Sequence, residues 1–110
     1  MKVIKEILIF ANTAGKQPFK KWLESLDSTV RNRITNRILR LSLGNYGDYK
    51  SLGQGIIELR LHFGAGYRVY FAEDGGTIVL LINGGNKKTQ KKDIQLAIEY
   101  LNEYLNNKVR

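Results

Sequence analysis

The sequence has no cysteine and only one histidine among its 110 residues. Without cysteine, the chain can form neither a disulfide framework nor a metal site with thiolate ligands. Catalytic zinc sites are typically built on two or three histidines, or on cysteine with histidine, and this chain cannot supply either set. We therefore expect a protein that uses no metal and no cofactor.

Long hydrophobic runs are also missing. The apolar run near the start covers residues 7–11, which is shorter than the hydrophobic region of a signal peptide, and no cleavage site follows it. A membrane-spanning helix needs roughly 18 or more apolar residues, and no run in the chain approaches that length. These absences predict a cytoplasmic protein with no membrane partner.

Acidic residues are the third shortage. Ten Asp and Glu residues stand against eighteen Lys and Arg residues, which gives a formal net charge of +8 and a pI near 9.8. This excess implies a polyanionic partner, which could be nucleic acid, an anionic membrane surface or an acidic protein. The length is that of one ordinary domain, and no linker or repeat interrupts the chain, so we expect a single domain over residues 1–110.

The chain begins with a predicted strand and a short helix. Residues 3–10 are rich in β-branched and aromatic side chains, which favour a strand. Pro18, the sole proline, fits the first position of a helix that reaches about residue 26. Trp22 lies on the apolar face of that helix, where a role in the core is favoured over stacking on a nucleobase.

A second helix with a basic flank follows. Asp27 or Ser28 caps its start, and Gly44 ends it after residue 43. Its apolar residues recur with the helical period and are expected to face the core. Arg33, Arg37 and Arg40 occupy a neighbouring stripe, which is either a solvated basic face or a surface that contacts phosphates. Residues 45–54 predict a loop.

Residues 56–82 predict a meander of three strands. From residue 57 to residue 63 apolar and polar side chains alternate, so that one face points to the core and the other to water. Gly64-Ala65-Gly66 is typical of a hairpin loop and would pair Phe63 with Tyr67. Residues 78–82 lack alternation and predict a central strand covered on both faces. In the expected register, five side chains gather on the solvent face: Glu58, Arg60, His62, Arg68 and Tyr70.

The chain closes with a helix whose start carries four lysines: Lys87, Lys88, Lys91 and Lys92. We expect this helix from about residue 90 to 106, with Thr89 as N-cap and a frayed tail behind it. The helix macrodipole disfavours cations at this end, whereas free backbone N–H groups there bind anions. The cluster therefore predicts a phosphate site, with solvated lysines of no role as the alternative.

The order of the elements and three segments resemble the RelE/ParE toxin superfamily. IIELRLHFGAGYRVYF, GGTIVLLINGGNKKTQKKDI and AIEYL are similar to its HigB-like "addiction module killer protein" branch. The expected fold is α+β and RelE-like, with a mixed sheet of about four strands, two N-terminal helices on one face and a C-terminal helix. The resemblance implies the toxin of a type II toxin–antitoxin pair, which enters the ribosomal A site and cuts translated mRNA without a metal. It also implies a neutralising antitoxin, in this branch typically a helix-turn-helix protein.

The resemblance also implies residue roles. Relatives cleave by attack of the ribose 2′-OH on its own 3′-phosphate, which leaves a cyclic phosphate. Arg60 and Arg68 fall where relatives hold the scissile phosphate, and Lys87, Lys88 and Lys91 fall in the basic segment after the last strand. Other branches place a substrate-contacting aromatic near the position of Ile94, or end in His-Tyr. This chain has neither, which leaves the identity of the general base open.

Cleavage through the 2′-OH needs a base, positive charge for the phosphorane and an acid. Arg60 and Arg68 suit the charge, because a guanidinium binds phosphate oxygens in pairs. His62 or Glu58 could be the base, His62 being better matched to neutral pH, while Glu58 could instead form a salt bridge to Arg60 or Arg68. The expected catalytic residues are Arg60, Arg68, His62, Glu58 and Lys91, and the expected RNA- or phosphate-binding residues are Lys87, Lys88, Lys92, Tyr70, Arg37 and Arg40.

Two other functions fit the same sequence. A ParE-like protein would inhibit DNA gyrase by binding, without catalysis of its own. A non-catalytic RNA- or DNA-binding module would gain its affinity from counterion release by the basic residues.

Overall fold

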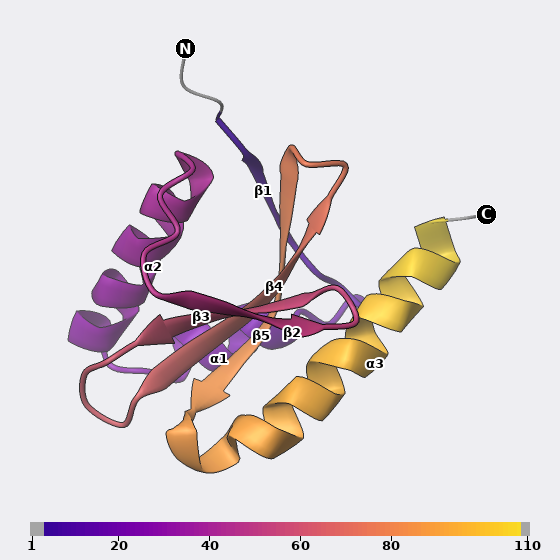
Figure 1. Ribbon diagram of the computed structural model, residues 1–110. Helices are drawn as coiled ribbons and strands as arrows, with labels where there is room; N and C mark the ends of the chain where they lie inside the picture. The colour runs from indigo at the N-terminus through magenta and orange to yellow at the C-terminus, as the bar shows by residue number, and fades with distance from the viewer. Residues whose placement is uncertain (1–3, 109–110) are drawn as a thin grey trace.

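The computed structural model describes residues 4–108 and has an α+β fold (Figure 1). Three α-helices and five strands make up this part of the chain. In chain order they are β1 (Glu6–Ile9), α1 (Pro18–Glu24), α2 (Ser28–Ser42), β2 (Tyr49–Gly53), β3 (Ile56–Leu61), β4 (Tyr67–Asp74), β5 (Ile78–Asn86) and α3 (Gln90–Lys108). A 3-10 helix (Lys87–Thr89) joins β5 to α3.

The strands form one mixed sheet in the order β1-β5-β4-β3-β2. β1 is parallel to β5, and the other neighbours are antiparallel. β2 occupies the region predicted as a loop, residues 45–54, so the sheet has one strand more than the four expected. Because β2 is an edge strand with mostly exposed side chains, it lacks the apolar alternation from which a strand is predicted.

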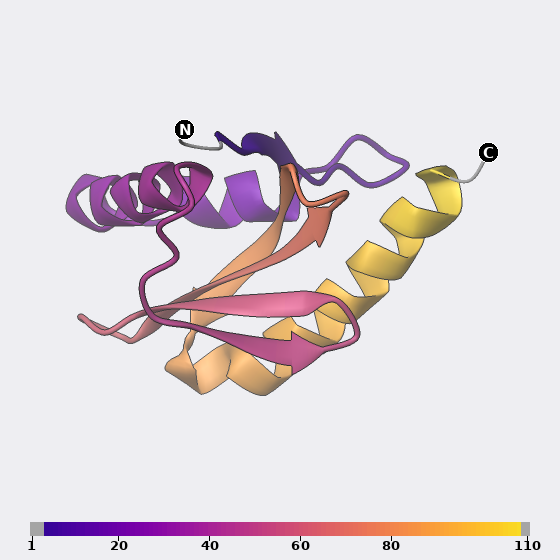
Figure 2. The same cartoon turned by 45° about the horizontal axis from the view of Figure 1, so that its top comes forward.

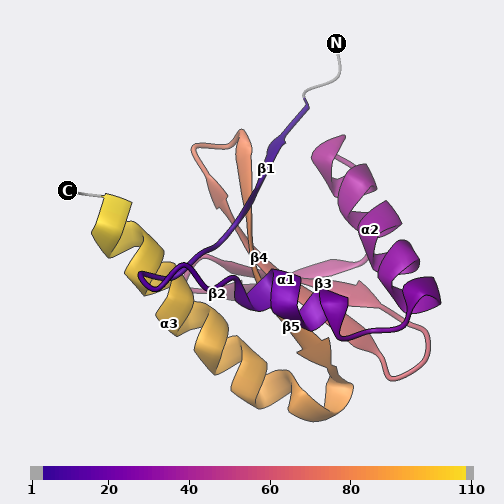
Figure 3. The ribbon, with the colours of Figure 1, turned by 180° about the vertical axis from the view of Figure 1, so that it is seen from behind.

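Helices cover both faces of this sheet. α1 and α2 lie on one face, and α3 crosses the other (Figures 2 and 3). Phe19 and Ile34 pack on the first face, whereas Ala97 and Leu101 pack on the second. The face that we predicted to be open to water is therefore partly a second core, and that prediction is wrong.

The β3–β4 hairpin pairs two residues away from the predicted register. Leu61, rather than Phe63, lies opposite Tyr67, and Arg60 lies opposite Arg68. Residues 62–66 form the connection. A shift of two residues leaves every strand side chain on its predicted face, whereas a shift of one would have reversed them all. Arg60 and Arg68 are thus direct neighbours on one face of the sheet.

The N-terminal elements largely follow the prediction. α1 starts at Pro18 and ends at Glu24, two residues before the expected end. The Asp27 carboxylate accepts a hydrogen bond from the backbone N–H of Val30 at 3.0 Å and so caps α2. α2 ends at Ser42, and Gly44 follows in the left-handed region. The predicted first strand is observed over Glu6–Ile9, and its first residue, Val3, lies outside the described residues.

β5 and α3 are both longer than predicted. β5 continues beyond residue 82, where the predicted strand ended, to Asn86, so the Gly84-Gly85 pair lies inside the strand. α3 reaches Lys108, which makes residues 106–108 helical rather than frayed, while residues 109 and 110 lie outside the described residues. Within residues 4–108, none of the helices combines the length and the apolar character that crossing a membrane requires.

Candidate functional site

Glu58 of β3 lies at the centre of the basic side chains and is 0 % exposed. Its Oε1 accepts a hydrogen bond from Nε of Arg60 at 2.8 Å. Its Oε2 accepts one from Nε2 of Gln90 at 2.6 Å and one from the Tyr70 hydroxyl at 3.2 Å. Nε of Arg68 lies 3.9 Å from the same Oε2. Both carboxylate oxygens are therefore engaged, and the predicted salt bridge between Glu58 and Arg60 is confirmed.

The surroundings of Glu58 keep it ionised. Burial alone would raise the pKa of this carboxyl group, but the hydrogen bonds from Arg60, Gln90 and Tyr70 outweigh burial and hold the pKa below its usual range. A carboxylate with a low pKa and two occupied oxygens is a weak proton acceptor. Its geometry suits the positioning of the arginines better than a role as general base.

Arg68 of β4 is a nearly buried cation with unused hydrogen-bonding capacity. Its side chain is 9 % exposed. Nη1 reaches the carbonyl oxygens of Gly66 and Tyr67 only at 3.4 Å each. Within residues 4–108, its buried Nε has no hydrogen-bond partner. A buried donor without a hydrogen bond costs free energy, and here the cost is offset by the charge of the Glu58 carboxylate 3.9 Å away.

Arg68 lines a hollow of about 420 Å³ beside the hairpin connection, which we call the hairpin hollow. Its lining consists of His62, Phe63, Gly64, Ala65, Gly66, Arg68 and Lys87. The hollow thus brings together a guanidinium from β4, an imidazole from the hairpin connection and an ammonium group from the 3-10 helix. This combination favours an anionic ligand such as a phosphate.

His62 lies in the hairpin connection rather than on a strand opposite Arg68 as predicted. Its exposed ring bonds through Nε2 to Oδ2 of Asp48, a residue just before β2. The hydrogen bond with His62 is the main cause that lowers the pKa of Asp48, and a carboxylate at Asp48 requires that Nε2–H of His62 be the donor. That tautomer leaves Nδ1 of His62 as the basic nitrogen. Sequence analysis missed Asp48, because nothing in the predicted loop placed it near the hairpin.

The guanidinium group of Arg37 donates its hydrogen bonds to backbone carbonyl oxygens. It donates to the carbonyl oxygens of Arg60 at 2.7 Å, Asp48 at 2.8 Å and Tyr46 at 3.2 Å. Burial lowers the pKa of Arg37. These bonds hold the segment with Asp48 against β3, so the contacts of Arg37 are those of a structural clamp. Its predicted role in phosphate binding stays a prediction.

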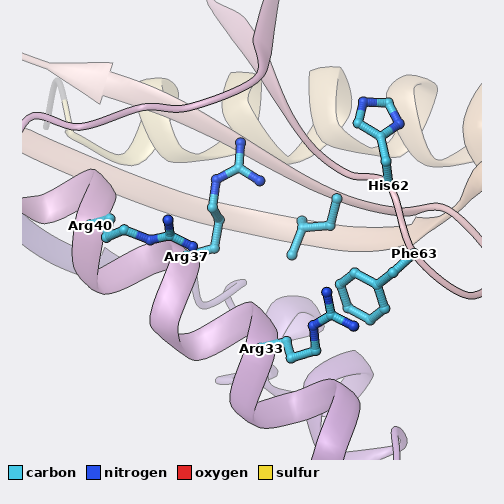
Figure 4. A pocket seen from close by; sticks show the side chains of 6 residues that line it. Arg33, Arg37, Arg40, His62 and Phe63 are labelled. Carbon is cyan, nitrogen blue, oxygen red and sulfur yellow. The ribbon is translucent and has the colours of Figure 1, made fainter.

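A second hollow, of about 150 Å³, lies between α2 and the hairpin (Figure 4). This arginine hollow is lined by Arg33, Arg37, Arg40, Leu61, His62 and Phe63. It shares His62 and Phe63 with the hairpin hollow, so the two hollows are adjacent. Arg33, Arg37 and Arg40 therefore line a hollow on the α2 side of the sheet, whereas Glu58, Arg60 and Arg68 lie on the side that α3 crosses.

The four lysines do not share one environment. Lys87 lines the hairpin hollow, whereas Lys88, Lys91 and Lys92 are exposed around the start of α3. Asn86 is the N-cap of the 3-10 helix that leads into α3, and its side chain accepts from the N–H groups of Lys88 and Thr89. Contrary to the prediction, these two backbone N–H groups are therefore not free to bind an anion. Thr89, the predicted N-cap, is the last residue of the 3-10 helix.

Tyr70 was predicted on the solvent face and is instead 0 % exposed beneath α3. Burial raises the pKa of its hydroxyl, which donates to Glu58. Tyr70 supports the Glu58 network from inside, and this position leaves it no surface on which an RNA base could lie. Across residues 4–108, histidine, aspartate and glutamate side chains form no group of three or more that could hold a metal ion.

The sequence profile of the "Phage derived protein Gp49-like" family matches residues 21–102, a range that contains both hollows. A protein of Haemophilus influenzae (strain ATCC 51907 / DSM 11121 / KW20 / Rd), called "Uncharacterized protein", is 48% identical over 80 residues. This match covers 72% of the present chain and 81% of that protein. The chain therefore belongs to the phage-derived Gp49-like family, a RelE-like family that is associated with toxin–antitoxin systems.

Proposed function

We propose that this chain is the toxin of a type II toxin–antitoxin pair, of the HigB-like kind, and that it cuts mRNA on the ribosome. The observation that carries the proposal is the direct pairing of Arg60 with Arg68 across β3 and β4, with the buried Glu58 carboxylate beside both. Directly opposed side chains have Cβ atoms roughly 5 Å apart. Two guanidinium groups at that spacing can hold one phosphodiester from two sides.

The reaction is transfer of the phosphoryl group to the neighbouring ribose oxygen. The 2′-oxygen forms a bond to phosphorus, the bond from phosphorus to the 5′-oxygen breaks, and a 2′,3′-cyclic phosphate and a 5′-hydroxyl result. Arg60 and Arg68 stabilise the extra negative charge of the phosphorane. Glu58 acts on the reaction through these arginines, because it fixes their orientation.

Two side chains of the hairpin hollow suit the proton transfers. His62 can accept the 2′-OH proton at Nδ1, while Asp48 holds the ring through Nε2. Lys87 lines the same hollow and can deliver a proton to the departing 5′-oxygen or add charge. Lys91, expected as catalytic from the resemblance, lies on the exposed first turn of α3, and we assign it to binding of the RNA backbone.

A matched pair of variants tests the proposal. Arg68→Ala removes a guanidinium from the hairpin hollow, and Arg31→Ala removes one from α2 that donates to the carbonyl oxygen of Leu26 at 3.0 Å and lines neither hollow. After brief induction, primer extension on mRNA should reveal cuts within translated codons for the parent and for Arg31→Ala. Cleavage by Arg68→Ala should be at least about 100-fold slower, which is the usual loss in rate when one donor to a developing oxyanion is removed.

Circular dichroism of the purified variants controls for loss of folding. Intact transcripts together with DNA-damage signalling would refute mRNA cleavage and favour gyrase inhibition. An Arg68→Ala protein as toxic as the parent would refute the role of the arginine pair.

A type II toxin implies a partner antitoxin. We expect it to be encoded next to this gene, to be of the helix-turn-helix kind and to carry an acidic segment that folds as it docks on the basic hollows. Co-expression of the adjacent gene should restore growth.

A further inference from the structure

Phe63 lies on the border between the two hollows and carries an arginine on its ring. Cζ of Arg33 is 3.7 Å from the centroid of the Phe63 ring. The Tyr67 ring packs at its side, with centroids 5.2 Å apart and the planes tilted by 47°. Figure 4 shows the Arg33 side chain reaching from α2 to this ring, while Arg37 and Arg40 point elsewhere. The result is a flat cationic and aromatic surface built from two elements.

This surface is open to a ligand. Arg33 is exposed and Phe63 is partly exposed, and both line the arginine hollow. An arginine on a surface ring adds little to the stability of a fold. The stack instead resembles the surfaces on which unpaired bases are bound, since bases stack on aromatic rings and on the planes of guanidinium groups.

We propose that Arg33 and Phe63 form a stacking site for one nucleobase of single-stranded RNA, beside the hairpin hollow that Arg68 lines. The inference rests on the proposed function and adds a substrate contact that neither the sequence nor the family supplies. Phe63 belongs to both hollows, so a base on the Arg33–Phe63 stack and a phosphate beside Arg68 can belong to neighbouring positions of one strand.

The site contributes affinity rather than base selection. Every base has a flat face, so stacking tolerates all four, and selection requires hydrogen bonds to base edges. An acidic peptide is the competing ligand for a basic hollow, but it would use the charge of Arg33 and not its plane. Replacement of arginine by lysine separates these possibilities, because lysine keeps the charge and removes the plane.

The test uses a short 2′-O-methyl RNA that contains 2-aminopurine. This RNA cannot be cleaved through its 2′-oxygen, and stacking quenches the fluorescence of 2-aminopurine. The parent protein should bind the RNA and quench it. Arg33→Lys and Phe63→Leu should each lose most of the quenching and bind at least about five-fold more weakly, as expected for loss of one stacking contact. Arg31→Lys, the same exchange on the same helix, should behave as the parent.

Three results would overturn the stacking site: no binding or no quenching by the parent, undiminished quenching by both variants, or an equal loss in Arg31→Lys. Arg33 is exposed, so Arg33→Lys leaves the core intact and keeps the test valid even if Phe63→Leu loosens the hairpin. Cleavage on ribosomes is measured separately. Quenching without any cleavage by the parent would refute the nuclease alone, and cleavage without quenching would refute the stacking site alone.

Discussion

The single residue on which the site depends is an acid. Two guanidinium groups on neighbouring strands repel each other, and Arg68 in addition is nearly out of contact with water. Glu58 supplies the negative charge between them, and Gln90 and Tyr70 hold that charge in place. Without the Glu58 carboxylate, the positive charges of Arg60 and Arg68 would lose the acid that they share. The first role of Glu58 is therefore to stabilise the fold, and any role in a reaction depends on it.

Replacing Glu58 by Gln should therefore destabilise the protein in a pH-dependent way. The pKa of Glu58 is lower in the fold than its ordinary value of 4.5. Its contribution to stability is then complete above pH 4.5 and is lost as the pH falls through the lower folded value. At pH 7 we expect Glu58→Gln to lose about 2–4 kcal/mol of unfolding free energy.

Urea unfolding at several pH values measures this loss. The gap to the parent should narrow as the pH falls below 4.5, whereas Glu99→Gln, at an exposed position of α3, should stay close to the parent throughout. Equal stabilities of Glu58→Gln and the parent at pH 7 would contradict the role assigned to Glu58.

At this scale the sequence identifies the residues on regular strands and misses those held by loops. The alternation in β3 placed Glu58, Arg60 and Arg68 on one face, and the two-residue error in register left that result intact. The bond between His62 and Asp48 and the Arg33–Phe63 stack join parts of the chain far apart in sequence. No local pattern encodes such contacts, because they depend on how the elements pack.

At the scale of the element, β5 shows why a pair of glycines can belong to a strand. A Cβ atom added at Gly84 would overlap the Trp22 ring of α1, and one added at Gly85 would overlap the Asp93 carboxylate of α3. Helices thus approach the backbone of β5 closely from both sides of the sheet. Sequence analysis ended the predicted strand at residue 82, before the glycines, because glycine weakens a strand and more often bounds one than lies inside it.

Gly84→Ala should for this reason be among the most damaging small substitutions in the chain. The Trp22 ring would have to move away from β5, and we expect a loss of about 3 kcal/mol, at the upper end of overpacking costs. Gly75→Ala is the contrast. An added Cβ there meets nothing within 4 Å, and only its φ of +66° is unfavourable, which costs about 1 kcal/mol.

Thermal unfolding of both variants decides the matter, and Trp22→Leu combined with Gly84→Ala should recover part of the loss. If Gly84→Ala were no worse than Gly75→Ala, the close contact between Trp22 and β5 would be refuted.

Some elements of this fold can be predicted from local sequence patterns, and others cannot. α2 carries a cap, a helical period and a terminal glycine, and its ends are within one residue of the prediction. β2 lacks the alternation of apolar and polar side chains that predicts a strand, because most of its side chains are exposed. Gly53, Gln54 and Gly55 all have positive φ, and this tight turn folds β2 back onto β3, so β2 exists through its partner rather than through its own residues.

For the molecule as a whole, basic residues from several elements line the two adjacent hollows beside the hairpin connection. Arg33 and Arg40 come from α2, Arg68 from β4 and Lys87 from the 3-10 helix. The order of the elements was enough to predict the fold. The position of the α2 arginines relative to the sheet was not predictable from the sequence, because it depends on how α2 packs. Part of the net charge of +8 is thus gathered around the two hollows.

Binding of single-stranded RNA should consequently fall steeply with salt. If the hollows neutralise about four phosphates, the logarithm of the affinity should fall with a slope of about −3 against the logarithm of the salt concentration, or roughly 50-fold between about 50 and about 200 mM. Arg40→Ala should make this slope shallower by about 0.7. Lys108→Ala removes one charge at the far end of α3, where Lys108 pairs with Asp74, and should leave the slope as in the parent. Fluorescence anisotropy with a labelled RNA measures all three proteins. A slope near zero, or equal changes in the two variants, would mean that the charge acts through the whole surface and not through the hollows.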